Sequence, residues 1–142
     1  MSYIRSHTDL LNIPEDFFEG QDIHVHVPAG ATPKDGPSAG LTIAIALISL
    51  LTDRPCRRDV ALTGELTLSG RILPVGGVKD KAMAAHRAGV KCVVFPDKND
   101  GDLREIPEDI KNDLEIITVS ELRDIVDIVL KENEMPVNNS TT

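Results

Sequence analysis

The sequence Gly36-Pro37-Ser38-Ala39-Gly40 and the apolar run that follows it constrain this chain more than any other segment. Proline is favoured at the first position of a helix, where its missing N–H would have no partner, and Asp35 or Gly36 suits the cap before it. The sequence Asp53-Arg54-Pro55 is typical of a helix end. We therefore expect a buried helix over residues 37–51.

The rest of the chain alternates between strand and helix patterns. Strands are expected at residues 21–27, 60–63, 65–68, 71–75, 90–95 and 114–119. Helices are expected at residues 2–11, 78–88, 102–106, 107–112 and 121–131. We expect Gly89 to end the second of these helices, Ser120 to cap the last, and Ser69-Gly70 to form a hairpin turn. This alternation predicts an α/β domain, and 142 residues suit a single domain.

Composition narrows the classes of partner and compartment. Hydrophobic residues make up 41% of the chain but aromatic residues only 3%, so the core must be aliphatic. The net charge of -8 argues against nucleic acid as a main partner, because phosphate binding needs a basic surface. No apolar run is long enough to span a bilayer, and residues 1–7 lack the apolar core of a signal peptide. Cys56 and Cys92 make no disulfide framework, which favours a reducing compartment.

Ser38 is the first candidate for chemistry. At a helix start, its hydroxyl would lie among unpaired backbone N–H groups at the positive end of the helix dipole. Small neighbours would leave the hydroxyl uncovered, so Ser38 is a candidate nucleophile or phosphate contact. The alternative is that Gly-Pro-Ser-Ala-Gly only starts a helix with close backbone packing.

A serine nucleophile needs a base, and histidine is the usual one. The alternating pattern of residues 21–27 places His24 and His26 on one face of a strand, whereas His7 and His86 are peripheral. No spacing singles out one of them as the base, and surface histidines are an equally simple interpretation. The spacing also does not supply the three or four ligands that a zinc site needs.

Lys81 is a better candidate base. On a helical wheel it falls within a stripe of small residues formed by Ala84, Ala85 and Ala88, whereas Lys79 falls toward the polar side. A lysine on a packing face is partly desolvated, which lowers its pKa and lets the neutral amine act as a base. The alternative is a lysine whose ammonium extends from the stripe into water.

Other residues near these segments are supporting candidates. Thr63 ends a strand and could orient the lysine amine, or be an ordinary strand threonine. Asp35 could cap the helix, or its charge could change the pKa of the lysine. Glu65 likewise has both a structural and a functional interpretation. Gly76-Gly77 could be only a tight turn between strand and helix.

Three ordered blocks of this chain resemble the proteolytic domain of the Lon family of ATP-dependent proteases. They are Gly30-Ala31-Thr32-Pro33-Lys34-Asp35-Gly36-Pro37-Ser38-Ala39-Gly40, then Leu62-Thr63-Gly64-Glu65-Leu66-Thr67-Leu68-Ser69-Gly70, then Ile72-Leu73-Pro74-Val75-Gly76-Gly77-Val78-Lys79-Asp80-Lys81. The resemblance runs from about residue 21 to residue 130. The family uses a Ser–Lys dyad, which maps onto Ser38 and Lys81. The supporting residues that the resemblance implies are Thr63, Asp35, His24, His26, Gly36 and Pro37.

The resemblance implies an α/β (α+β) fold with a mixed sheet and packed helices, similar to domain 2 of ribosomal protein S5. It implies a serine endopeptidase that hydrolyses peptide bonds of unfolded proteins through an acyl-enzyme. Residues 1–20 would be a remnant of a preceding helix and turn, residues 21–131 the proteolytic domain and residues 132–142 a disordered tail. The alternatives are a catalytically inactive assembly fragment of the same domain, or a phosphate-binding module similar to small-molecule kinases.

The resemblance also implies partners and a compartment. Family members carry an ATPase module that uses ATP and Mg, whereas this sequence has no Gly-x-x-x-x-Gly-Lys-Ser/Thr motif. We therefore expect no cofactor and no metal in this chain. The family forms six-membered rings, so a homo-oligomer is expected, with no membrane and no nucleic acid bound through this domain. The expected location is the bacterial cytoplasm, with the mitochondrial matrix as the alternative.

Overall fold

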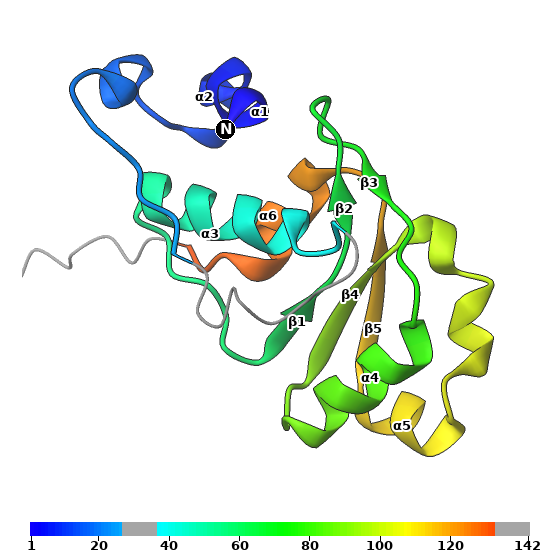
Figure 1. Ribbon diagram of the computed structural model, residues 1–142. Coiled ribbons are helices and arrows are strands. Elements are labelled where there is room, and N and C mark those ends of the chain that lie inside the picture. The colour runs from blue at the N-terminus through cyan, green and yellow to red at the C-terminus, as the bar shows by residue number, and fades with distance from the viewer. Residues whose placement is uncertain (27–36, 133–142) are drawn as a thin grey trace, which may run out of the picture.

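The computed structural model describes residues 1–26 and 37–132, which form an α/β fold (Figure 1). A parallel sheet lies at its centre, with the strand order β1-β4-β5. Its strands are β1 (Val60–Leu62), β4 (Cys92–Pro96) and β5 (Glu115–Val119). A separate antiparallel hairpin contains β2 (Glu65–Leu66) and β3 (Ile72–Leu73). The predicted α/β fold class is confirmed.

Helices cover both faces of the sheet (Figure 1). On one face lie α3 (Gly40–Thr52) and α6 (Leu122–Val129), and on the other lie α4 (Val78–Arg87) and α5 (Glu108–Asp113). The remaining helical segments are α1 (Ser2–Ser6), α2 (Thr8–Leu11), η1 (Glu15–Phe18), η2 (Asp97–Asn99) and η3 (Asp102–Glu105).

Strand β4 divides the core into two clusters because successive side chains of a strand point to opposite faces. Cys92 and Val94 pack with α3 and α6, whereas Val93 and Phe95 pack with α4 and α5. Every residue of β4 is buried, as expected for a central parallel strand.

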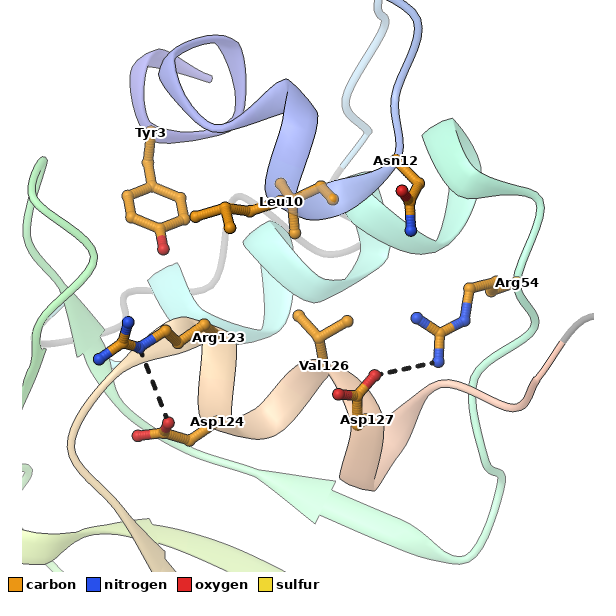
Figure 2. Close-up of a pocket in the computed structure, with 9 residues that line it drawn as sticks. Tyr3, Leu10, Asn12, Arg54, Arg123, Asp124, Val126 and Asp127 are labelled. Carbon is orange, nitrogen blue, oxygen red and sulfur yellow. Dashed lines mark hydrogen bonds and ion pairs between the residues drawn. The ribbon is translucent and has the colours of Figure 1, made fainter.

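The C-terminal end of α6 is tied to the segment that follows α3 (Figure 2). The Arg54 side chain donates hydrogen bonds to the carbonyls of Lys131 (3.0 Å) and Leu130 (3.3 Å) and lies 3.4 Å from a carboxylate oxygen of Asp127. Leu130 is the C-cap of α6, and a C-cap carbonyl has no partner within the helix, so the guanidinium is a favourable partner for it.

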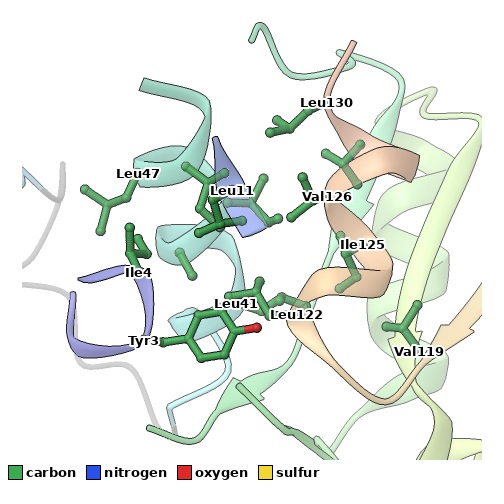
Figure 3. Close-up of a cluster of buried hydrophobic side chains, with 14 of the residues drawn as sticks. Tyr3, Ile4, Leu11, Leu41, Leu47, Val119, Leu122, Ile125, Val126 and Leu130 are labelled. Atoms are coloured by element: carbon green, nitrogen blue, oxygen red, sulfur yellow. The ribbon is translucent and has the colours of Figure 1, made fainter. Parts of the chain in front are cut away.

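The N-terminal helices pack onto α3 and α6 (Figure 3). Tyr3, Ile4 and Leu11 belong to the same buried cluster as Leu41 and Leu122. The helical prediction for residues 2–11 is therefore confirmed, although the segment forms two short helices.

The predicted strand over residues 21–27 is wrong within residues 21–26, the part that the structure describes. This segment is irregular, and it lies along α3, where His24 and Val25 share a cavity with Leu47. Alternating residues give a strand only when a neighbouring strand pairs with its backbone, and in the described structure residues 21–26 have no such neighbour.

The start of α3 also differs from the prediction. The helix begins at Gly40, with Ala39 as the cap, so Ser38 lies in a turn just before the helix instead of in its first turn. The N–H of Gly40 donates to the Pro37 carbonyl (3.1 Å), closing that turn. The predicted caps Asp35 and Gly36 lie outside the described residues, as do residues 133–142 of the tail.

Most other elements follow the predicted pattern, with boundaries shifted by a few residues. The hairpin turns at Gly70, and Gly89 follows α4 with a φ of 75°. The helically spaced apolar residues of α6 are buried: Leu122, Ile125, Val126 and Val129. Ser120 is not the cap of α6, because Glu121 occupies that position and the Ser120 carbonyl accepts a hydrogen bond from Ile72 (2.9 Å).

Candidate active site

Ser38 and Lys81 come from different parts of the fold and line the same two cavities. One cavity, of about 380 Å³, is also lined by Pro37, Glu65, Pro74, Val75 and Gly76. The other, of about 530 Å³, has a largely apolar wall that includes Leu62, Ala84, Ala85, Ala88, Val90 and Val93. Ser38, with its hydroxyl, and Lys81, with its amine, therefore lie where a more polar cavity meets a more apolar one.

The backbone that carries Ser38 is held by the end of the sheet. The Gly64 N–H donates to the Ser38 carbonyl, and the Leu41 N–H donates to the Gly64 carbonyl, each at 3.2 Å. Gly64 follows β1 and precedes the hairpin strand β2, so this pairing fixes the turn before α3 relative to both. The partly buried Ser38 side chain thus sits on a restrained turn at the positive end of α3.

Lys81 lies near the start of α4, where its N–H donates to the Gly77 carbonyl (3.0 Å). Burial lowers the pKa of its ammonium group. The small-residue stripe places Ala84, Ala85 and Ala88 on the same cavity wall, as the wheel predicts, whereas Lys79 is exposed. This environment favours the neutral amine that a general base requires.

In the described part of the chain, no hydrogen bond joins Ser38 Oγ to Lys81 Nζ. Catalytic hydrogen bonds are often long before substrate binds, so the shared cavity is the more informative feature. A hydroxyl next to a desolvated amine can act as a nucleophile once the amine takes its proton.

Thr63 and Glu65 line these cavities as well. Thr63 is 7% exposed at the end of β1, and its N–H donates to the Val94 carbonyl (3.3 Å). It faces the apolar cavity together with Ser38 and Lys81, while Glu65 faces the more polar one. The structure therefore brings Thr63 beside the candidate pair and places a carboxylate nearby.

His24 and His26 lie elsewhere. They line a third cavity, of about 360 Å³, along the outer side of α3 with Ile43, Ala46, Leu47 and Leu50. The described structure does not bring either histidine to the walls that Ser38 and Lys81 line. Of the other supporting candidates, Pro37 is on a wall of the more polar cavity, and Asp35 and Gly36 lie outside the described residues.

The burial of Asn99 was not predicted from the sequence, and neither was the place of Pro74 and Val75 on the cavity wall. Asn99 is a polar residue only 2% exposed, at the end of η2, which follows the buried strand β4. Its pattern, a polar residue in a loop, gives no sign of burial. Their position directly before Gly76-Gly77 and α4 could have indicated that Pro74 and Val75 lie near Lys81.

Across residues 1–26 and 37–132, no group of three or more His, Cys, Asp or Glu side chains could hold a metal ion. In the same part of the chain, no helix has the length and apolar character to cross a bilayer.

A sequence model described as the Lon protease (S16) C-terminal proteolytic domain matches residues 1–132. The chain belongs to this family of Lon C-terminal proteolytic domains.

Relatives from several bacteria support the assignment. The chain is 53% identical over 129 residues to Lon protease 1 of Thermus thermophilus, covering 91% of this chain and 16% of that protein. It is 52% identical over 130 residues to Lon protease of Syntrophus aciditrophicus, covering 92% of this chain and 16% of that protein. It is 54% identical over 130 residues to Lon protease of Roseiflexus castenholzii, covering 92% of this chain and 16% of that protein. The chain thus spans about a sixth of the length of these relatives.

Proposed function

We propose that this chain hydrolyses peptide bonds of unfolded proteins, with Ser38 as nucleophile and Lys81 as general base. The observation that carries the proposal is that both side chains line the same two cavities although they come from different elements. Membership of the Lon proteolytic-domain family supports the reaction class.

The proposed reaction begins when neutral Lys81 takes the hydroxyl proton as Ser38 Oγ attacks the scissile carbonyl. The tetrahedral oxyanion would be stabilised by backbone N–H groups next to Ser38. The N–H groups of Gly40 and Leu41 already donate to Pro37 and Gly64, so those of Ser38 and Ala39 are the proposed donors.

Protonated Lys81 then gives its proton to the leaving amine, and the C–N bond breaks to leave an acyl-enzyme on Ser38. Neutral again, Lys81 takes a proton from water as the water oxygen attacks the ester carbonyl. The bond between that carbon and Ser38 Oγ then breaks, Lys81 returns the proton to Ser38 Oγ, and the second product leaves as a carboxylic acid. Thr63, on the same cavity wall, is proposed to orient the Lys81 amine.

We further propose that cleavage of folded proteins depends on an ATPase module that uses ATP and Mg, that the domain works in a six-membered ring, and that it acts in the bacterial cytoplasm. These proposals rest on the resemblance to Lon proteases, and the chain's own chemistry would need no cofactor.

The test compares Ser38→Ala and Lys81→Ala with Lys79→Ala as the matched control. Peptide cleavage and labelling of Ser38 by a fluorophosphonate are measured, with circular dichroism to check the fold. We expect each of the first two changes to lower cleavage by about 100-fold or more, and Lys79→Ala to leave it near the unchanged level. Full activity in Lys81→Ala together with loss in Lys79→Ala would overturn the base assignment. A folded, unlabelled parent chain would instead favour the inactive assembly fragment.

A further inference from the structure

Asn99 is a buried polar side chain that the reaction described above does not use. It is 2% exposed at the end of η2, in the segment that follows β4. Buried polar groups are retained where hydrogen bonds satisfy them, and such groups fix the relative position of the segments they join.

The Asn99 amide binds both main-chain groups of one residue. The Val75 N–H donates to Asn99 Oδ1 (2.9 Å), and Asn99 Nδ2 donates to the Val75 carbonyl (2.8 Å). Asn99 Nδ2 also donates to a carboxylate oxygen of Asp102 (2.6 Å), which fixes the orientation of the amide. Asn99 thus pairs with Val75 as a neighbouring strand would.

Val75 belongs to the wall of the candidate active site. Together with Pro74 and Gly76 it lines the cavity that Ser38 and Lys81 share. The same loop leads from β3 into α4 (Figure 1). The carbonyl of its last residue, Gly77, accepts a hydrogen bond from the Lys81 N–H. Holding Val75 in place therefore holds both the cavity wall and the first turn of the helix that carries Lys81.

We propose that Asn99 is a positioning residue that anchors the loop Pro74-Val75-Gly76-Gly77 and so sets the placement of Lys81 relative to Ser38. The catalytic part of this inference rests on the proposed function, whereas the anchoring part does not. Asn99 touches no reacting atom, and its effect passes through Val75.

The experiment measures two quantities in Asn99→Ala: hydrogen exchange of the Val75 and Lys81 amides by NMR, and the rate at which a fluorophosphonate labels Ser38. We expect faster exchange at both amides and labelling slowed by about 10-fold to 100-fold, because small displacements of catalytic groups have effects of this size. Asn112→Ala, an exposed asparagine on α5, is the matched control and should change neither quantity.

A second pair of variants separates positioning from a general loss of stability. Asn99→Asp keeps an acceptor for Val75 but loses both donated hydrogen bonds and places a carboxylate against Asp102. Adding Asp102→Asn restores a donor between positions 99 and 102, so the double variant should label faster than Asn99→Asp alone. Equal labelling in the single and double variants would contradict the positioning role.

The outcomes also separate this inference from the proposed function. A parent chain that is not labelled would overturn the proposed function, and amide exchange would still decide whether Asn99 anchors the loop. Unchanged exchange in Asn99→Ala would overturn the anchoring. Faster exchange with unchanged labelling would overturn the effect on the site.

Discussion

The Gly64 N–H donates a 3.2 Å hydrogen bond to the Ser38 carbonyl, so the end of strand β1 fixes the turn that carries the candidate nucleophile. Gly64 can approach this closely because it has no side chain. An ideal Cβ at this position would lie 2.8 Å from Ile72 Cγ2 and 3.1 Å from Leu41 Cδ2. The contact links the core packing directly to the geometry of the site.

Replacing Gly64 with alanine should therefore weaken both the fold and the site. We expect the free energy of unfolding to fall by about 1–3 kcal/mol, as in other overpacked cores, and labelling of Ser38 to slow. Denaturant unfolding and fluorophosphonate labelling measure the two effects. Gly101→Ala is the control, because Gly101 has nothing within 4 Å of its ideal Cβ and a helical φ of -61°. Equal losses in the two variants would contradict the role of the Gly64 contact.

The reactivity of Ser38 should depend on pH through Lys81. Burial lowers the pKa of the Lys81 ammonium below its ordinary 10.5, and only the neutral amine can accept the serine proton. We expect labelling to rise with pH and to reach half its maximum below 10.5. Lys81→Arg should abolish the rise because a guanidinium stays protonated. An identical profile in Lys81→Arg would show that another group controls the reaction.

The same pKa shift predicts how stability changes with pH. The unfolded chain holds the Lys81 proton more tightly than the folded one, so the free energy of unfolding should increase as pH rises from the lowered pKa toward 10.5. The difference between the parent chain and Lys81→Met, followed by denaturant unfolding across this range, isolates the contribution of Lys81. A difference that does not vary with pH would argue against a desolvated ammonium.

The apolar cavity should accept apolar side chains of the peptide. Ala84 lies on its wall with Ser38 and Lys81, so Ala84→Leu would fill part of the space. We expect cleavage next to bulky apolar residues to fall by about 10-fold or more, with little change in labelling by a small fluorophosphonate. Ala46→Leu, in the cavity of His24 and His26, is the control. Equal effects of Ala84→Leu and Ala46→Leu on cleavage would show that this cavity does not bind the substrate side chain.

Arg54 should stabilise the fold mainly through the carbonyls of Leu130 and Lys131, which directly follow α6. We expect Arg54→Ala to lower the free energy of unfolding by about 1–3 kcal/mol. Asp127→Ala should change it by no more than about 0.5 kcal/mol, because the Asp127 side chain is 89% exposed and surface ion pairs contribute little. A double-mutant cycle with large coupling would show that the ion pair dominates instead.

Local patterns in the sequence predicted the helices that have one apolar face. Leu122, Ile125, Val126 and Val129 follow helical spacing, and all are buried on α6. The same reasoning placed Lys81 in a stripe of alanines on α4. Helical periodicity is a property of the segment alone, so it can be recognised without knowing the neighbours.

Tertiary structure decided which segments meet. Residues 21–26 have an alternating pattern but pair with no strand in the described structure, which leaves His24 and His26 apart from Ser38. The Ser38 carbonyl accepts its hydrogen bond from Gly64, and α3 begins only after Ser38, at Gly40. The buried Asn99 side chain accepts a hydrogen bond from the Val75 N–H, a partner far away in the sequence. The sequence by itself determined which residue types are present and which face of each single helix is apolar. Only the folded chain could decide the backbone partners, because hydrogen bonds between distant segments depend on how those segments pack.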